Sequence, residues 1–386
     1  MKSITARISF LAIPFALLLS LVLTGACRRE PEKGDARSFQ KQVEEAARGS
    51  KAPGLVIALR EPDGQFFVGV VGAADISTGA PMRVDSSFYI GTISQSMMAA
   101  MVFMLEEEGK LKLEDTLSRY LEFPGGESVT VEMLLDHSSG FADWTGRDIT
   151  STGNPQFPEL LKSPQTAESL LRIAAKGKPV FEPGTRQEGN YTNLLLLSRL
   201  IGTVEGKPAS RVFQERIFEP LGMQNTSYLG SGETLESLAH GYRAERGWRE
   251  PPVEGLTDVS WADENLRELA YMGIVSNAED VVKYHVGLRT GGLIPEESFE
   301  RMRRVRPGKL NGLGYQISKG ARGTWEGNNG HAVGHLSCNY YHVERGFYLA
   351  VLGNLGDSAL PLARLWDLRY GDSDTGSEAS LGGVQE

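Results

Sequence analysis

The chain has 386 residues, 40% of them hydrophobic, and this length can bury a large core in one compact unit of two lobes. The formal net charge of −9 argues against a nucleic-acid partner, because such a partner favours a basic surface. The sequence contains no glycine-rich phosphate-binding loop and no internal repeat, so we expect no nucleotide and no other cofactor.

The first 26 residues have the pattern of an export signal. Lys2 and Arg7 precede an uncharged stretch that ends in the sequence LTGAC at Cys27. This ending resembles a lipobox, so we expect residues 1–26 to be removed and Cys27 to carry lipid. An uncleaved membrane helix and simple cleavage after Ala26 are the alternatives. In each case the domain faces the periplasm or the cell exterior, and the lipid anchor would tether it to a membrane.

Residues 27–37 are charged and are predicted to be a linker, and residues 371–386 are predicted to be a disordered tail because Ser, Gly and acidic residues dominate them. The domain between them therefore covers residues 38–370. If Cys27 is lipidated, Cys338 has no partner in the chain, and we expect no disulfide within the domain.

Secondary-structure patterns divide this domain into two lobes. Residues 38–47 have helical character, and two β-rich runs at 53–60 and 66–71 flank Pro62-Asp63-Gly64, which predicts a hairpin. Residues 95–266 are mostly helical in pattern, and Leu349–Leu352 is a later strand followed by a helix near the end of the domain. We predict an α+β fold in which an inserted, mainly helical lobe accompanies an antiparallel sheet lobe flanked by helices. The helical lobe covers about 91–266, and the sheet lobe about 38–90 and 267–370.

The segment Thr92-Ile-Ser-Gln95 stands directly before an apolar run, Met97–Leu105. This is the pattern of a capping box, in which the Thr92 side chain bonds the backbone N–H of Gln95 and the Gln95 side chain reaches back. The run is apolar on every face, so we expect a helix that is buried on all sides. A Thr hydroxyl is also a potential nucleophile, and the spacing suits both uses.

Six further segments occur in the same order as in the class C type of the family of serine β-lactamases and penicillin-binding proteins, which also includes D,D-peptidases and esterases. They are GKLKLEDTLSRYL (109–121), VEMLLDHSSGF (131–141), FEPGTR (181–186), IFEPLGM (217–223), GIVSNAED (273–280) and LAVLGN (349–354). With weaker similarity elsewhere, the resemblance covers most of the chain between the N-terminal segment and the tail. It implies the β-lactamase/D,D-peptidase-like fold.

The first two catalytic motifs of that family are altered in this chain. The family's S-x-x-K motif falls on Thr92 and Gln95, and Gln95 has no basic nitrogen to take a proton. The family's Tyr-x-Asn motif falls on Gly189-Asn190-Tyr191 in an alignment without gaps. A shifted alignment would use Tyr191-Thr192-Asn193 instead and would keep the tyrosine.

The third family motif, Lys-Thr-Gly or His-x-Gly, falls on Asn328-Asn329-Gly330, where the glycine is kept and the basic group is missing. A gapped alignment would make His331 the motif histidine but would lose the glycine. His137, in the His-Ser-Ser-Gly segment, is expected to be a structural turn residue.

A positioned general acid or base contributes about 10² to 10⁴ in rate, so losing the lysine, the tyrosine and the third-motif base together should leave little hydrolysis. We therefore predict a ligand-binding or regulatory pseudoenzyme, whose ligand by analogy is a small molecule, a cell-wall peptide, an acyl-D-amino acid or an ester. The alternative is a weak hydrolase of esters, amides or cell-wall peptides that uses Thr92, with Tyr191 or His331 as the base.

A third alternative is metal binding, because four potential ligands lie close together in the sequence. They are His331, His335, Cys338 and His342. The strand-like pattern around them would turn His335 away from Cys338 and His342, which disfavours this alternative.

Overall fold

The computed structural model describes residues 35–145, 157–229, 235–244, 255–269, 271–356 and 361–370. The expected signal peptide, lipidation site Cys27 and C-terminal tail lie outside these ranges. In the described part of the chain, no helix combines the length and apolar character needed to cross a bilayer.

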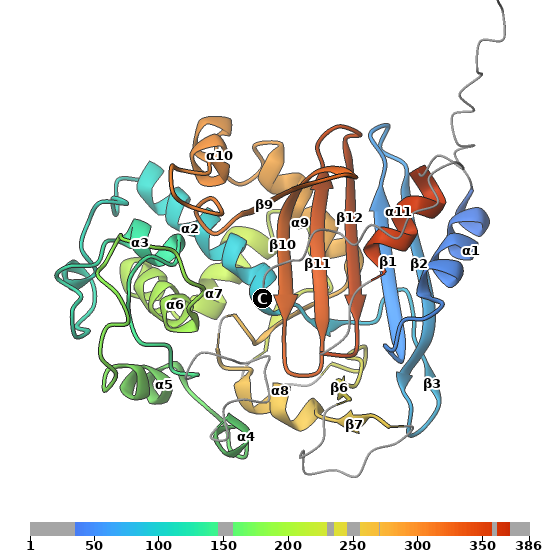
Figure 1. The fold of residues 1–386 in the computed structure, drawn as a ribbon, viewed down its shortest axis with the longest axis horizontal. Coiled ribbons are helices and arrows are strands. Elements are labelled where there is room, and N and C mark those ends of the chain that lie inside the picture. Colours follow the sequence, from blue (N-terminus) through green and yellow to red (C-terminus); the bar gives the residue numbers. More distant parts are fainter. Residues whose placement is uncertain are drawn as a thin grey trace, which may run out of the picture. The chain divides into compact units, whose positions relative to one another are not determined.

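A seven-stranded antiparallel sheet forms one lobe of the described structure, in the order β3-β2-β1-β12-β11-β10-β9 (Figure 1). The strand near the start of the domain, β1, pairs with β12 near its end, with Leu55 opposite Gly353. The hairpin predicted at Pro62-Asp63-Gly64 joins β1 to β2. The strands are β1 (Gly54–Arg60), β2 (Phe66–Asp75), β3 (Ala80–Pro81), β9 (Gln316–Gly320), β10 (Gly323–His331), β11 (Leu336–His342) and β12 (Phe347–Gly353).

Helices cover both faces of this sheet. On β1, Leu55, Ile57 and Leu59 belong to a core beneath α1 (Ala36–Ala47) and α11 (Leu362–Tyr370), whereas Val56 and Ala58 belong to the main core on the other face. Alternate side chains of a strand point to opposite faces, so a central strand covered on both sides is apolar throughout. Figure 1 shows α1 beside α11, which brings the two ends of the domain together. The helix α1 begins two residues inside the expected linker, where Asp35 caps it by accepting a hydrogen bond from the Ser38 N–H at 2.9 Å.

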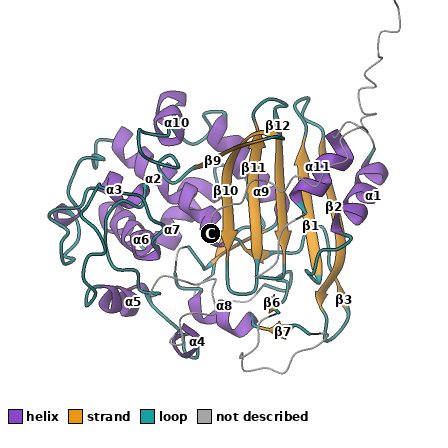
Figure 2. Cartoon of the chain, viewed as in Figure 1, coloured by secondary structure: helices purple, strands orange, loops and turns teal. Residues whose placement is uncertain are grey.

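The other lobe is mainly helical and comes from the middle of the chain (Figure 2). Every residue of the apolar run Met97–Leu105 is buried in α2, as the sequence predicts. The α+β prediction is confirmed. The helical elements other than α1 and α11 are η1 (Gly91–Ile93), α2 (Ser94–Glu107), η2 (Leu117–Arg119), α3 (Val131–Leu135), α4 (Phe157–Leu160), α5 (Ala167–Ala174), α6 (Tyr191–Glu205), α7 (Ala209–Phe213), η3 (Gln214–Phe218), α8 (Ser260–Leu266), α9 (Ala278–Arg289) and α10 (Glu296–Arg303).

Short strands complete the described fold. They are β4 (Phe88–Tyr89), β5 (Ser227–Tyr228), β6 (Tyr242–Arg243), β7 (Thr257–Asp258) and β8 (Ile274–Ser276). The pairing of β4 with β8 matters most for the site, because β4 ends one residue before η1 and so helps to position that turn.

Candidate active site

Thr92 lies in η1, the short helical turn that leads into α2, and this turn packs against the end of strand β10. Gly91 has a positive φ of 51°, and a Cβ atom on it would lie 2.2 Å from the carbonyl oxygen of His331. A Cβ on Gly330 would likewise lie 1.9 Å from the carbonyl oxygen of Ile90. Only glycine allows the two backbones to come this close, and their contact positions Thr92.

The Thr92 hydroxyl donates a hydrogen bond of 3.0 Å to the carbonyl oxygen of Asn329 on β10. This carbonyl lies on the edge of β10 that β9 leaves free, because the β9 pairing ends at Gly327. The backbone N–H of Asn329 donates to Oε1 of Gln316 at 3.4 Å on the same edge. Side chains therefore satisfy both backbone groups of Asn329.

The predicted capping box is wrong. The residue that caps α2 is Ile93, and neither it nor Ile90, which caps η1, makes a side-chain capping bond. Because Thr92 lies within a helical turn instead of the extended conformation of a capping residue, its hydroxyl turns towards β10. The Gln95 side chain does not reach back but contacts His137.

His137 contacts Gln95 of the first motif, a neighbour that the sequence did not predict. Its positive φ of 58° agrees with the expected turn, but the residue is also partly buried, and Nε2 of its ring lies 2.8 Å from the side-chain nitrogen of Gln95. Its Nδ1 accepts a hydrogen bond from the backbone N–H of Asn190 at 3.2 Å and lies 3.3 Å from the side-chain nitrogen of Asn193. Burial lowers the pKa of His137 to about 4, so the ring is neutral at pH 7. In the sequence, the only sign that His137 lies near Gln95 was its position in the segment 131–141, which resembles the family.

At the second motif, the position of the family tyrosine is empty. A Cβ atom on Gly189 would meet no described heavy atom within 4 Å. Tyr191 begins α6, and its ring stacks on Tyr271 at a centroid distance of 5.3 Å. Its backbone N–H donates to Asp143 at 2.6 Å. Within the described residues, the structure gives no hydrogen bond between the hydroxyls of Thr92 and Tyr191, and the shifted alignment with Tyr191 as the base stays a prediction.

At the third motif, Asn328 is buried and its side-chain nitrogen donates to the carbonyl oxygen of Gly314 at 3.2 Å. Its buried amide oxygen finds no hydrogen-bond partner among the described residues. His331 is three residues further along β10, and strand alternation turns it to the opposite face. Burial and the nearby Arg243 lower the pKa of His331, and in the described part of the chain its Nδ1 has no hydrogen-bond partner. Within the described ranges, His331 makes no hydrogen bond with Thr92.

Two cationic side chains form ion pairs with the carboxylate of Asp136, the residue directly before His137. Arg306 and Lys309 come from the loop between α10 and β9, and both pair with Asp136, directly before His137. The Lys309 ammonium lies 3.3 Å from the Asp136 carboxylate. These cations compensate a buried carboxylate, which is costly to leave unpaired.

The metal-binding alternative is wrong for the residues that the structure describes, since no group of three potential ligands converges there. His335 contacts Asp263 at 3.1 Å and the carbonyl oxygen of Ala239 at 3.1 Å, so both of its ring nitrogens are occupied. Burial in the core raises the pKa of Cys338 to about 12, so its thiol stays protonated and is a poor ligand. His342 stacks on Trp366 and hydrogen bonds the carbonyl oxygen of Arg322.

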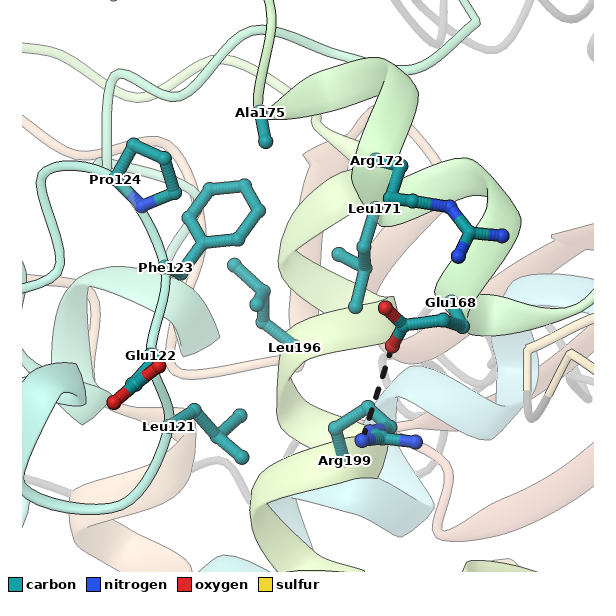
Figure 3. A pocket seen from close by; sticks show the side chains of 10 residues that line it. All are labelled: Leu121, Glu122, Phe123, Pro124, Glu168, Leu171, Arg172, Ala175, Leu196 and Arg199. Carbon is teal, nitrogen blue, oxygen red and sulfur yellow. Dashed lines mark ion pairs between the residues drawn. The ribbon is translucent and has the colours of Figure 1, made fainter.

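Two surface cavities lie away from these motif residues. Figure 3 shows the first, of about 310 Å³, between α5, α6 and residues 121–124. Apolar side chains such as Phe123 and Leu171 form its walls, and an ion pair of 3.9 Å between Glu168 and Arg199 lies at one side. The second, of about 410 Å³, includes Met104, Pro220 and Leu293. Neither includes Thr92, Gln95 or Asn328.

The altered motifs lie at the start of α2, at the start of α6 and on β10, and together they define a protein of the β-lactamase and penicillin-binding class. Residues 39–369 match the sequence profile of the Beta-lactamase family, and the chain belongs to this family. The family is hydrolytic and serine-hydrolase-like.

Relatives with assigned names include a putative penicillin-binding protein of Bacillus subtilis, 28% identical over 61% of this chain and 55% of that protein. A D-aminopeptidase of Brucella anthropi is 28% identical over 55% of this chain and 40% of that protein. The chain thus spans about half the length of the curated relatives it matches.

Solved structures extend the similarity over the whole domain. The D-amino acid amidase of Ochrobactrum anthropi in complex with D-phenylalanine is 25% identical, with a TM-score of 0.74 over 86% of this chain and 98% of the amidase. A D-stereospecific amidohydrolase of Streptomyces is 22% identical, with a TM-score of 0.71 over 87% of this chain and 99% of that protein, and this likeness concerns the fold.

Proposed function

We propose that this protein is a ligand-binding member of the β-lactamase family that does not hydrolyse its ligand. The observation that carries this proposal is the hydrogen bond from the Thr92 hydroxyl to the carbonyl oxygen of Asn329. A nucleophilic hydroxyl must give its proton to a base, and a backbone carbonyl is far too weak a base to take it.

The neighbouring groups support the same conclusion. Gln95 and Asn328 carry amides, which do not titrate, and Gly189 carries no side chain. His137 is a base in principle, but its Nδ1 already accepts the backbone N–H of Asn190. The described part of this site therefore supplies hydrogen bonds and shape but no group that is ready to activate Thr92.

The class of ligand follows by analogy from the relatives, whose names concern penicillin binding, D-aminopeptidase and D-amino acid amidase activities. We propose a cell-wall peptide or another small amide or ester of a D-amino acid. The export signal and Cys27 suggest that the domain acts outside the cytoplasm on a lipid tether, where binding without turnover suits a regulatory role.

Binding and turnover can be measured together on the purified domain. D-phenylalanine amide at about 100 times its dissociation constant should stabilise the fold by roughly 2.7 kcal/mol, while chromatography finds no D-phenylalanine released above a buffer control. Stabilisation with steady release would refute the absence of hydrolysis. A lack of stabilisation by this amide and by a panel of cell-wall peptides would refute the ligand class.

The second candidate is a weak hydrolase that uses Thr92, and the hydrolytic names of the relatives favour it. In that case Thr92→Ser would retain the release of D-phenylalanine and Thr92→Ala would abolish it. Under our proposal, all three proteins give the same background rate.

A further inference from the structure

A chain of hydrogen bonds leads from Phe141 through Ser139 and Asn193 to His137, the residue that contacts Gln95. The backbone N–H of Phe141 donates to Oγ of Ser139 at 3.2 Å, so the Ser139 hydroxyl is free to donate its own proton. It does so to Oδ1 of Asn193 at 2.7 Å. The oxygen of the Asn193 amide is thereby fixed, and its NH₂ group faces Nδ1 of His137 at 3.3 Å.

Nδ1 of His137 must be the unprotonated nitrogen of the ring. The backbone N–H of Asn190 also points at it from 3.2 Å, and a backbone N–H can only donate. Two independent donors, Asn190 and Asn193, thus meet the same ring nitrogen. A proton on Nδ1 would oppose both of them.

The other ring nitrogen then carries the hydrogen. Burial keeps the ring of His137 neutral at pH 7 by lowering its pKa to about 4, and a neutral imidazole has one N–H. This N–H is on Nε2, which lies 2.8 Å from the amide of Gln95. The structure places the Gln95 side-chain nitrogen at this distance, so two donors would oppose each other, whereas a half-turn of the amide makes its oxygen the acceptor.

We infer that His137 holds the carbonyl oxygen of Gln95 and that the Gln95 NH₂ group faces the open side of the site, where it donates to a carbonyl or carboxylate oxygen of the ligand. Gln95 is only partly buried, and its contact with His137 is the one side-chain hydrogen bond that it makes within the described residues. The other end of its amide is therefore available to a ligand.

This inference rests on the proposed function and deepens it. Gln95 stands where the family has a lysine, so a neutral donor takes the position of an ammonium. Gln95 can still direct a hydrogen bond at an acceptor oxygen, but it supplies neither a positive charge nor a base. The site would then bind a carbonyl or carboxylate oxygen of the ligand without the lysine that drives the reaction in the family.

Nuclear magnetic resonance tests the orientation without any ligand. At pH 7 the ¹⁵N spectrum should show His137 protonated on Nε2 alone, with the signal assigned by its loss in His137→Gln. The side-chain NH₂ of Gln95 should exchange with water freely because it faces the open site. A proton on Nδ1, a doubly protonated ring or a protected Gln95 NH₂ would overturn the inference, whatever the protein binds.

Binding tests the role of Gln95, with D-phenylalanine as the carboxylate probe and D-phenylalanine amide as the carbonyl probe. Gln95→Met has similar length but no donor, and should weaken at least one probe roughly threefold to tenfold, the range of one neutral hydrogen bond. Gln95→Glu should weaken D-phenylalanine more, because its second oxygen repels the carboxylate. Gln65→Glu, an exposed residue of the β1–β2 hairpin, is the charge-matched control and should change neither.

The pattern of loss identifies the oxygen that Gln95 binds. Weakening of D-phenylalanine alone indicates a carboxylate, and weakening of the amide probe indicates a carbonyl. Wild-type affinity of Gln95→Met for both probes would refute the role in binding. Failure of both probes to bind the wild type would count against the proposed ligand class, and the magnetic resonance result would still decide the orientation.

Discussion

Replacement of Thr92 tests the central hydrogen bond of the site. Thr92→Val keeps the shape of the side chain but removes the donor to the carbonyl oxygen of Asn329. A neutral hydrogen bond contributes about 0.5–1.5 kcal/mol net, and a carbonyl left unpaired and buried costs about 1–3 kcal/mol. Because Thr92 is only partly buried, water can replace part of the bond, and we expect a loss of about 1 kcal/mol.

Two further substitutions at Thr92 separate donation from capping. Thr92→Ser retains the donor and should have nearly wild-type stability. Thr92→Asp would suit a helix cap, but a carboxylate cannot donate to the Asn329 carbonyl and is repelled by it, so this variant should be the least stable of the three.

Urea denaturation of the four proteins measures these differences. Thr290→Val is the matched control, because Thr290 donates to the backbone carbonyl of Val286 at 2.8 Å on an exposed surface and its loss should cost little. Wild-type stability of Thr92→Asp, or equal losses in Thr92→Val and Thr290→Val, would refute the importance of the bond to Asn329.

Three other predictions follow from the site and the N-terminus. Neither the wild type nor Thr92→Ser combined with Gln95→Lys should form a covalent adduct with penicillin or fluorophosphonate probes, since the other two motifs stay altered; a stoichiometric adduct on Thr92 by intact mass would contradict this. Burial lowers the pKa of His137 to about 4 and of His285 to about 3, so between these values and about 6.5 the unfolded chain binds protons that the native state does not. Stability should therefore fall as the pH drops below 6.5, by up to about 1.4 kcal/mol per pH unit for each histidine, and a flat urea-midpoint profile from pH 7 to 5 would refute this. Finally, Cys27 should carry lipid and Cys27→Ser should accumulate as an unlipidated precursor, which mass spectrometry of the N-terminus can check; an unmodified Cys27 in the mature wild type would refute it.

The sequence predicted those parts of the fold that depend on local apolar patterns. The unbroken apolar run Met97–Leu105 indicated a helix buried on all sides, and α2 buries each of these residues. The two β-rich runs around Pro62-Asp63-Gly64 indicated the hairpin of β1 and β2. In both cases the pattern of side chains along a few turns or strands is set by burial, so a single sequence reveals it.

The interactions of the site were much harder to predict. The capping pattern at Thr92 is a local preference, but the acceptor that the hydroxyl finds, Asn329, lies 237 residues away. His137 lies 42 residues from Gln95 and meets it only because the left-handed turn directs the ring into the site. Tertiary contacts of this kind override local propensity, and no spacing in the sequence encodes them.

The close backbone contact between η1 and β10 also decides how the glycines at positions 91 and 330 are to be interpreted. Any side chain at Gly91 or Gly330 would collide with the opposite backbone, so both positions are closed to substitution for reasons of folding alone. A family member without hydrolytic activity would need both glycines as much as an active one, whereas a Cβ on Gly189 would meet no described atom within 4 Å. Packing alone therefore explains the glycine of the third motif, Gly330, and its presence is not a sign of activity.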